Sequence, residues 1–244
     1  MALGSAPRTT GGRAICNLFA NTMPQAAMRA LFDVAPADDR LGNQAPLRAI
    51  FPRGDAPVVR LGQGDAAGRR ELVPMHWGFV LPQVSKRTGE PILPKAVNNA
   101  RDDKLLASSF WRESFERRRC LLPGTSFSEA QGRSPAVVHW FGVLGEEGKP
   151  GPFAFAAIWR RWRGLYRDEP REIDTVSMVT TTPNALVRPV HPDRMPAILD
   201  PEDWAAWLEA SPRDALALIR PFPAERMAVL GRGEGMRSEP DLVL

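Results

Sequence analysis

The chain has 244 residues, of which 43% are hydrophobic and 25% charged, and this apolar content suffices for one domain with a buried core. The net charge of +4 is too small to indicate a nucleic-acid partner, and the excess of arginine over lysine is equally explained by a GC-rich genome. No apolar run approaches the roughly 20 residues that span a bilayer. Residues 1–15 lack the apolar segment of a signal peptide, so we expect a cytoplasmic protein.

The N-terminal part begins with small, polar residues, and we expect residues 1–15 to be disordered or absent. A helix should begin at about Pro24, with Thr22 or Met23 near its cap. Met28, Leu31 and Phe32 would share one face of this helix. Residues 35–55 are rich in Pro, Gly and Asp and predict a long loop.

Strand patterns dominate the middle of the chain, where apolar runs are rich in β-branched and aromatic residues. Helical spacing of Leu106, Phe110 and Phe115 predicts one helix over residues 105–117. The predicted strands cover residues 56–61, 72–81, 119–122, 136–144, 153–159 and 175–181.

Two helix starts follow near the C-terminus. Asp200 can cap a helix whose first residue is Pro201, and the Trp204, Trp207 and Leu208 stripe is typical of a core-facing surface. Ser211 repeats the same start signal. Many strands with few helices indicate an α+β fold with a curled mixed sheet. We expect one domain over residues 16–231 and a tail over residues 232–244.

Cysteine and histidine are the residues that can carry chemistry here. The chain has only Cys16 and Cys120, without the clusters that bind metals, so we expect no metal and no cofactor. A thiol is a good nucleophile, and Cys16 is either that or a small buried hydrophobe; Cys120, in an apolar strand, is expected to be buried. His191 lies in a polar loop, where an imidazole can move protons.

The other two histidines, His76 and His139, lie in strands and are expected to be structural. Glu129 is either a solvated carboxylate or a buried one with a raised pKa that can act as acid or base. Asn98, Asn99 and Arg101 follow a strand; the asparagines there can simply close a turn, and the arginine beside them could hold a phosphate.

Several motifs occur in an order that resembles the SOS response-associated peptidase family. The resemblance runs from Cys16 to about Leu230. The motifs are CNLF at residues 16–19, HWGF at 76–79, NNAR at 98–101, RCLLPGTSFSE at 119–129, HPDRMPAIL at 191–199 and PEDW at 201–204.

The resemblance implies a fold and a site. A central, barrel-like mixed β-sheet with peripheral helices would carry a groove for single-stranded DNA. The resemblance makes Cys16 the nucleophile, and matches Asn99, Glu129 and His191 to its catalytic partners. It also assigns Arg101 and Arg194 to phosphates and Trp77 to base stacking.

The implied activity is covalent capping of abasic sites in single-stranded DNA by a monomer. The α-amine of Cys16 would attack the aldehyde of the open sugar, and its thiol would close a thiazolidine ring on the same carbon. This chemistry requires a free α-amine, whereas 15 residues precede Cys16. Translation from the Ile15 codon or self-cleavage before Cys16 would supply that amine, and a retained extension would silence crosslinking. Leu18 and Ala130 also stand where family members often carry Arg and Trp.

Two other functions fit the same residues. Cys16, His191 and Asn99 or Glu129 could form a papain-like protein-cleaving site, in which case abasic DNA would give no adduct. A non-catalytic nucleic-acid-binding module would keep its salt-dependent binding when Cys16 is replaced by alanine.

Overall fold

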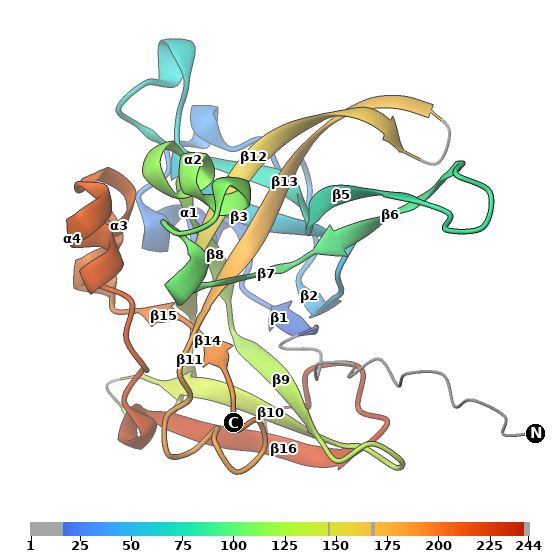
Figure 1. The fold of residues 1–244 in the computed structure, drawn as a ribbon. Coiled ribbons are helices and arrows are strands. Elements are labelled where there is room, and N and C mark those ends of the chain that lie inside the picture. The colour runs from blue at the N-terminus through green and yellow to red at the C-terminus, as the bar shows by residue number, and fades with distance from the viewer. Residues whose placement is uncertain (1–16, 146, 167–168, 242–244) are drawn as a thin grey trace, which may run out of the picture.

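Five strands close into a barrel at the centre of the structure (Figure 1). A computed structural model describes residues 17–145, 147–166 and 169–241. The strands pair in the order β13-β4-β3-β8-β12, and pairing of β12 with β13 closes the ring. Only the β4–β13 pair is parallel, which makes the barrel mixed and confirms the predicted α+β fold. The strands are β3 (Asp55–Leu61), β4 (Arg70–Trp77), β8 (Arg119–Gly124), β12 (Phe153–Tyr166) and β13 (Glu169–Thr181).

Alternating side chains of the barrel strands enter two separate cores. In β12, Phe155 and Ala157 point into the barrel, whereas Ala154 and Ala156 lie in the core outside it. Both sets are buried, which is why this strand reads as an unbroken apolar run. Cys120 lies inside the barrel, as expected for a buried hydrophobe, and burial raises the pKa of its thiol.

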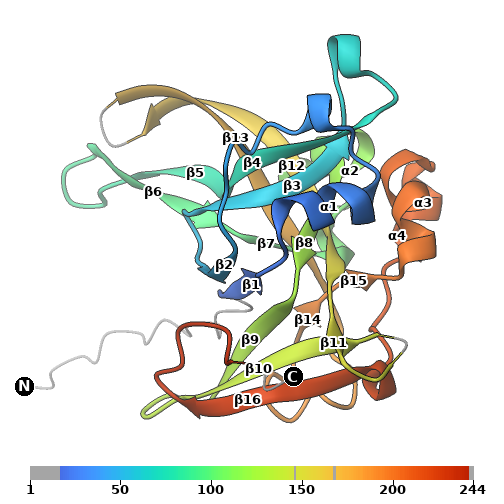
Figure 2. The ribbon, with the colours of Figure 1, turned by 180° about the vertical axis from the view of Figure 1, so that it is seen from behind.

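Helices cover the outer core (Figure 2). The first predicted helix begins at Gln25, and Met28 and Phe32 are buried. Leu31 is 38% exposed, contrary to the predicted face. Phe32 stacks on Trp204 of α3, with 4.5 Å between ring centroids. The helices are α1 (Gln25–Phe32), α2 (Ser109–Arg117), α3 (Trp204–Glu209) and α4 (Pro212–Ala217).

Two helices begin later than the sequence predicts. The helix predicted from residue 105 begins at Ser109, because the hydroxyl of Ser108 accepts a hydrogen bond from the Phe110 N–H. Residues Pro201–Asp203 form a 3-10 turn before α3, and Asp200 makes no capping hydrogen bond. The start of α4 is as predicted, with Ser211 accepting from the Asp214 N–H at 3.2 Å.

A second sheet lies beneath the barrel (Figure 1). Its strands follow the order β11-β10-β9-β1-β2, and β16 pairs with β10. The chain passes from β8 of the barrel into β9 of this sheet after a single residue, Thr125. The strands are β1 (Phe19–Asn21), β2 (Leu47–Ile50), β9 (Ser126–Gln131), β10 (Val137–Leu144), β11 (Pro150–Gly151) and β16 (Met227–Glu234).

Three sequence expectations change in detail. The strand predicted over residues 72–81 breaks at Gly78, where φ is +127°, and continues as β5 (Phe79–Val84), which pairs with β6 (Pro91–Val97). The loop predicted over residues 35–55 contains β2 and a 3-10 turn, Pro36–Asp38. Part of the expected C-terminal tail packs on the fold, because β16 extends to Glu234 and Glu239 is buried.

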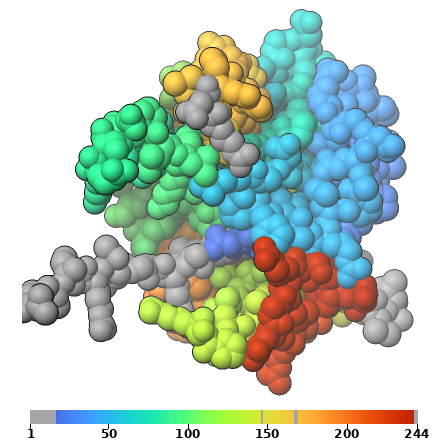
Figure 3. Space-filling model, turned by 90° about the vertical axis from the view of Figure 1, so that its right-hand side faces the viewer, coloured from blue at the N-terminus to red at the C-terminus, as the bar shows by residue number. Residues whose placement is uncertain are grey.

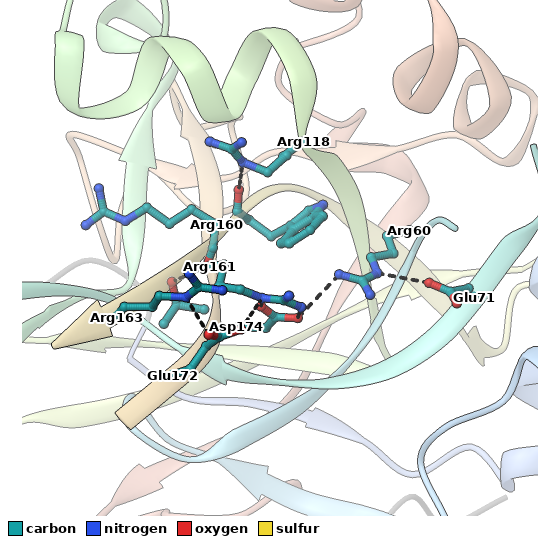
Figure 4. A network of polar contacts seen from close by, with 10 residues as sticks. Arg60, Glu71, Arg118, Arg160, Arg161, Arg163, Glu172 and Asp174 are labelled. Carbon is teal, nitrogen blue, oxygen red and sulfur yellow. Dashed lines mark hydrogen bonds and ion pairs between the residues drawn. The ribbon is translucent and has the colours of Figure 1, made fainter. Parts of the chain in front are cut away.

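A network of ion pairs joins strands β3, β4, β12 and β13 of the barrel (Figure 4). Arg60 reaches Glu71 at 3.2 Å and Asp174 at 3.4 Å, and its guanidinium lies 4.4 Å from the Trp159 ring centroid. Burial raises the pKa of Asp174, but hydrogen bonds and charge from Arg161 and Arg60 outweigh it and hold the pKa low. In the described part of the chain, no helix is long and apolar enough to cross a membrane.

Candidate functional site

The NNAR segment is fixed against the barrel by its first asparagine. The carbonyl of Asn98 accepts hydrogen bonds from the Trp77 Nε1–H at 3.0 Å and the Met178 N–H at 2.9 Å. Residues Asn99–Arg101 then form β7, which runs parallel to β13. Asn99 is half-buried and its side-chain oxygen is inaccessible to solvent, whereas Arg101 is exposed at the end of β7.

Trp77 is part of the inner core. Its ring is fully buried and packs edge-on against Phe19 at 4.8 Å between centroids. Such a ring is not available to stack on a nucleotide base. The expected base-stacking role is therefore replaced by a structural one, because the indole N–H holds Asn98.

Glu129 is a buried carboxylate in β9, with 3% of its surface exposed. Of the two alternatives that the sequence left open, burial is the one that the structure contains. Glu129 lies directly opposite His139 of β10, and facing residues of an antiparallel pair share one side of the sheet. That side faces the inner core, because Phe127 and Phe141 lie on the same side and belong to that core.

The chain enters the described structure between β7 and β9. Asn17 accepts a hydrogen bond from the Asn98 side chain at 3.1 Å, and the Leu18 carbonyl accepts one from the Ser128 N–H at 2.9 Å. In Figure 3 the dark blue start of the described chain lies between the light blue segments above it and the yellow-green and red strands of the second sheet below. Cys16 itself lies outside the described residues.

His191 lies in the loop between β13 and β14 (Met195–Pro196) and is 1% exposed. Its Nδ1 accepts a hydrogen bond from the Arg194 N–H at 3.1 Å. An imidazole that accepts at Nδ1 carries its proton on Nε2 when it is neutral. The loop lies against β9, because the Gln131 side chain donates to the Pro189 carbonyl at 3.1 Å.

The two arginines expected to hold phosphates differ in exposure. Arg101 has a side chain that is 51% exposed and pairs with Asp103 at 2.9 Å, and this bond raises its pKa. Arg194 is only 5% exposed and pairs with Asp102 at 2.6 Å. Both guanidinium groups are thus paired with a carboxylate in this structure, that of Arg101 at the surface and that of Arg194 in a buried position.

Three further residues matter to this site, of which only Asn98 was considered from the sequence as part of a possible site. Asn98 anchors the segment at Asn17, Asp102 binds Arg194, and His139 faces Glu129. The alternating pattern within each strand indicates on which side of its strand His139 or Glu129 lies. It does not reveal the register between the two strands, which makes these residues neighbours. Among residues 17–145, 147–166 and 169–241, no group of His, Cys, Asp and Glu could hold a metal ion.

Comparison with known sequences places the chain in a family. The sequence model of the SOS response associated peptidase (SRAP) family matches residues 15–231. The chain belongs to the SRAP family.

Relatives of this SRAP chain include three abasic site processing proteins. YoqW of Bacillus subtilis is 29% identical over 188 residues, which are 76% of this chain and 75% of YoqW. YobE of the same organism is 28% identical over 188 residues, covering 76% of this chain and 77% of YobE. HMCES of Gallus gallus is 27% identical over 212 residues, covering 78% of this chain and 62% of HMCES.

Solved structures share the fold of this SRAP chain. A protein from Bordetella bronchiseptica superposes with a TM-score of 0.67 at 22% identity, over 90% of this chain and 99% of that one. A protein from Bacteroides thetaiotaomicron gives a TM-score of 0.61 at 23% identity, over 86% and 90% of the two chains.

Proposed function

We propose that this SRAP protein processes abasic sites in DNA, and that it caps them in single-stranded DNA through a covalent bond to Cys16. Relatives that cover three quarters of the chain are named abasic site processing proteins. The observation that carries the proposal is the position of Asn17 and Leu18, the residues that follow Cys16. They are bonded on one side to Asn98, beside Asn99, and on the other to Ser128, beside Glu129.

The proposed reaction joins both reactive groups of Cys16 to one carbon. The open form of an abasic sugar carries an aldehyde, and the free α-amine of Cys16 adds to it and releases water to give an imine. The thiol then adds across the imine carbon–nitrogen bond, the nitrogen takes up the proton, and a five-membered thiazolidine results. Because amine and thiol belong to one residue, the second step is intramolecular and fast. β-Elimination from the imine intermediate would be the lyase activity.

Three side chains are proposed to assist. His191, protonated at Nε2, donates a proton to the sugar ring oxygen and so helps to open the ring. Glu129, which is buried, positions the α-amine and carries its protons. Asn99 holds Cys16 by hydrogen bonds. Arg101 binds a DNA phosphate.

The amine must be free before the imine can form, because an acylated nitrogen lacks the lone pair for attack. We propose that the active protein begins at Cys16, either by translation from the Ile15 codon or by cleavage of its own Ile15–Cys16 bond. The second route would account for a peptidase activity. An intact protein that retains residues 1–15 and still crosslinks fully would contradict this requirement. We further propose that the protein acts in the cytoplasm as a monomer.

The proposal is tested with protein that begins at Cys16 and a single-stranded oligonucleotide containing one abasic site. Wild-type protein should form an adduct that survives heating in denaturant, and Cys16→Ala should form none. Cys120→Ala is the matched control, because it removes the other thiol, which is buried in the barrel. A stable adduct with Cys16→Ala would rule out the thiazolidine.

The alternatives give different results in the same experiment. A protein-cleaving peptidase would release peptides from a protein substrate and leave abasic DNA unmodified. A non-catalytic binding module would form no adduct in any variant, while its DNA affinity would be the same with and without Cys16.

A further inference from the structure

A row of polar side chains crosses the second sheet and starts at the candidate site. Glu129 of β9 lies opposite His139 of β10, and His139 lies opposite Arg232 of β16. Facing residues of antiparallel pairs project from one side of a sheet, so these three side chains share the side of Glu129. Because adjacent strands are about 4.8 Å apart, the backbone of Arg232 is roughly 10 Å from that of Glu129.

Arg232 is the exposed end of this row. It belongs to β16, an edge strand whose described pairing is with β10 alone. Within residues 17–145, 147–166 and 169–241, no carboxylate lies within ion-pair distance of Arg232, whereas Arg101 pairs with Asp103 at 2.9 Å. An arginine at the surface without a carboxylate partner keeps its planar donor fork for a ligand such as a phosphate.

His139 reports the field that Arg232 creates in this row. The ring is 8% exposed, and its Nε2 is buried without a hydrogen-bond partner in the described residues. Burial and, after it, the charge of Arg232 lower the pKa of His139. A positive potential that disfavours a proton on this ring favours an anion near Arg232.

Arg101 and Arg232 lie on opposite sides of the segment that follows Cys16. Arg101 ends β7 on the barrel, and Arg232 belongs to the second sheet. Asn17 and Leu18 lie between them, bonded to Asn98 and to Ser128. Figure 1 shows β7 above β1 and β16 below it. An abasic sugar has a phosphate on each side, so a DNA strand that crosses here brings one phosphate toward each sheet.

We propose that Arg232 is a phosphate contact on the second sheet, and that single-stranded DNA passes from Arg101 to Arg232 with the abasic sugar between them. This inference rests on the proposed function, because it extends the path of the same DNA strand beyond Cys16. A contact to the phosphate backbone holds the strand in place whatever its base sequence.

The test compares charge changes on the same face of β16. Affinity for undamaged single-stranded DNA is measured over a range of salt concentrations for wild type, Arg232→Gln, Arg232→Lys and Glu234→Gln. Glu234 is an exposed carboxylate two residues beyond Arg232. Arg213→Gln is the matched control, because Arg213 is also an exposed arginine but belongs to α4, which packs on the outer core.

Arg232→Gln should lower the salt slope by about one unit, because one phosphate contact is lost. Arg232→Lys should keep the wild-type slope, since its charge is retained. Glu234→Gln should bind DNA more tightly than wild type, because a negative charge beside the phosphate is removed. Arg213→Gln should bind like wild type.

The imidazole NMR signals of His139 give a second readout, which His139→Gln assigns among the three histidines of the chain. Glu129 on β9 and Arg232 on β16 are the charged residues opposite His139 on its two neighbouring strands. Addition of undamaged single-stranded DNA should raise the pKa of His139 in wild type, because the phosphate offsets the charge of Arg232. In Arg232→Gln that pKa should be higher before DNA is added and should rise less afterwards.

Either of two results would overturn the inference. One is a salt slope in Arg232→Gln equal to that of wild type and Arg213→Gln. The other is an equal rise in the pKa of His139 with DNA in wild type and Arg232→Gln. If wild-type protein binds no single-stranded DNA, the proposed function fails as well, and that result is distinct from both.

Discussion

At the scale of single residues, side chains of the same type differ in burial and in hydrogen-bond partners, and therefore in role. Arg101 and Arg194 both lie in motifs expected to bind phosphate, but only Arg101 is exposed. His139 and His191 are both buried, yet His191 has an Nδ1 acceptor bond that fixes its tautomer. The chemistry of each residue follows from its neighbours as much as from its type.

Arg101→Ala should weaken binding to single-stranded DNA equally for all sequences and lower the salt slope by about one unit, because one phosphate contact is lost. Binding is measured by fluorescence anisotropy over a range of salt concentrations. Arg220→Ala is the matched control: its side chain is also 51% exposed and paired with aspartate, but it lies beside α3 and α4. Equal slopes in Arg101→Ala and wild type would make Arg101 a purely structural residue.

His139 should make the fold sensitive to acid. Burial, together with the charge of Arg232 on the facing strand, lowers the pKa of His139 below 6.5. The unfolded chain therefore binds the proton more readily, and the stability associated with neutral His139 is complete above about pH 6.5 and falls as pH drops through the lower folded pKa.

His139→Gln should consequently lose less stability than wild type when pH is lowered from about 7 to about 5. The free energy of unfolding in urea measures this, with His76→Gln, a half-buried histidine on β4, as control. The same acid loss in wild type and His139→Gln would show that the charge on His139 does not differ between the folded and unfolded states.

At the scale of elements, a break in a strand positions the site. Gly78 separates β4 from β5 at φ +127°, which turns β5 toward β6 while Trp77 stays in the core. A Cβ at this position would lie 2.6 Å from the Ala96 Cβ. The break thus allows the β5–β6 hairpin to return directly to Asn98.

Gly78→Ala should destabilise the fold by about 2 kcal/mol or more, through backbone strain and the clash with Ala96. Gly89→Ala in the β5–β6 turn is the control, because its φ is also positive at +74° but nothing lies within 4 Å of an added Cβ. Urea unfolding should show the larger loss for Gly78→Ala. Equal losses would mean that the clash is relieved by movement of β6.

At the scale of the whole molecule, one buried arginine joins the barrel to two helices. Arg119 of β8 donates to the Phe115 carbonyl of α2 at 2.8 Å, to the Trp207 carbonyl of α3 at 2.5 Å and to the Ala210 carbonyl. These carbonyls are among those that helices leave without partners at their C-terminal ends. Burial lowers the pKa of Arg119, and each of its three side-chain nitrogens donates to a carbonyl.

Arg119→Met should lower the free energy of unfolding by about 3 kcal/mol or more, because two buried carbonyls and one part-buried carbonyl lose their donor. The neighbouring Arg118→Met is the control: Arg118 is partly exposed and pairs with the exposed Glu113. Its loss should be at most about 1 kcal/mol. Similar losses for the two variants would indicate that water replaces the guanidinium of Arg119.

The sequence by itself determined the elements whose signals are local. Apolar runs located the barrel strands, and Ser211 located the start of α4 at Pro212. The ordered motifs also identified the family before the fold was known. The break at Gly78 depends on one backbone angle that the sequence does not show, whereas the start of α2 follows from Ser108, a local cap signal that the helical spacing from Leu105 overrode.

Only the tertiary structure decided which side chains share a site and which are sealed from it. Trp77 is a residue type that a DNA-binding surface would use, but the inner core covers its ring; Arg194 is buried and pairs with Asp102. Glu129 is buried, and the register in which β9 and β10 pair sets it opposite His139. Register, burial and pairing arise from contacts between residues far apart in the chain, and these long-range contacts leave no local pattern in the sequence.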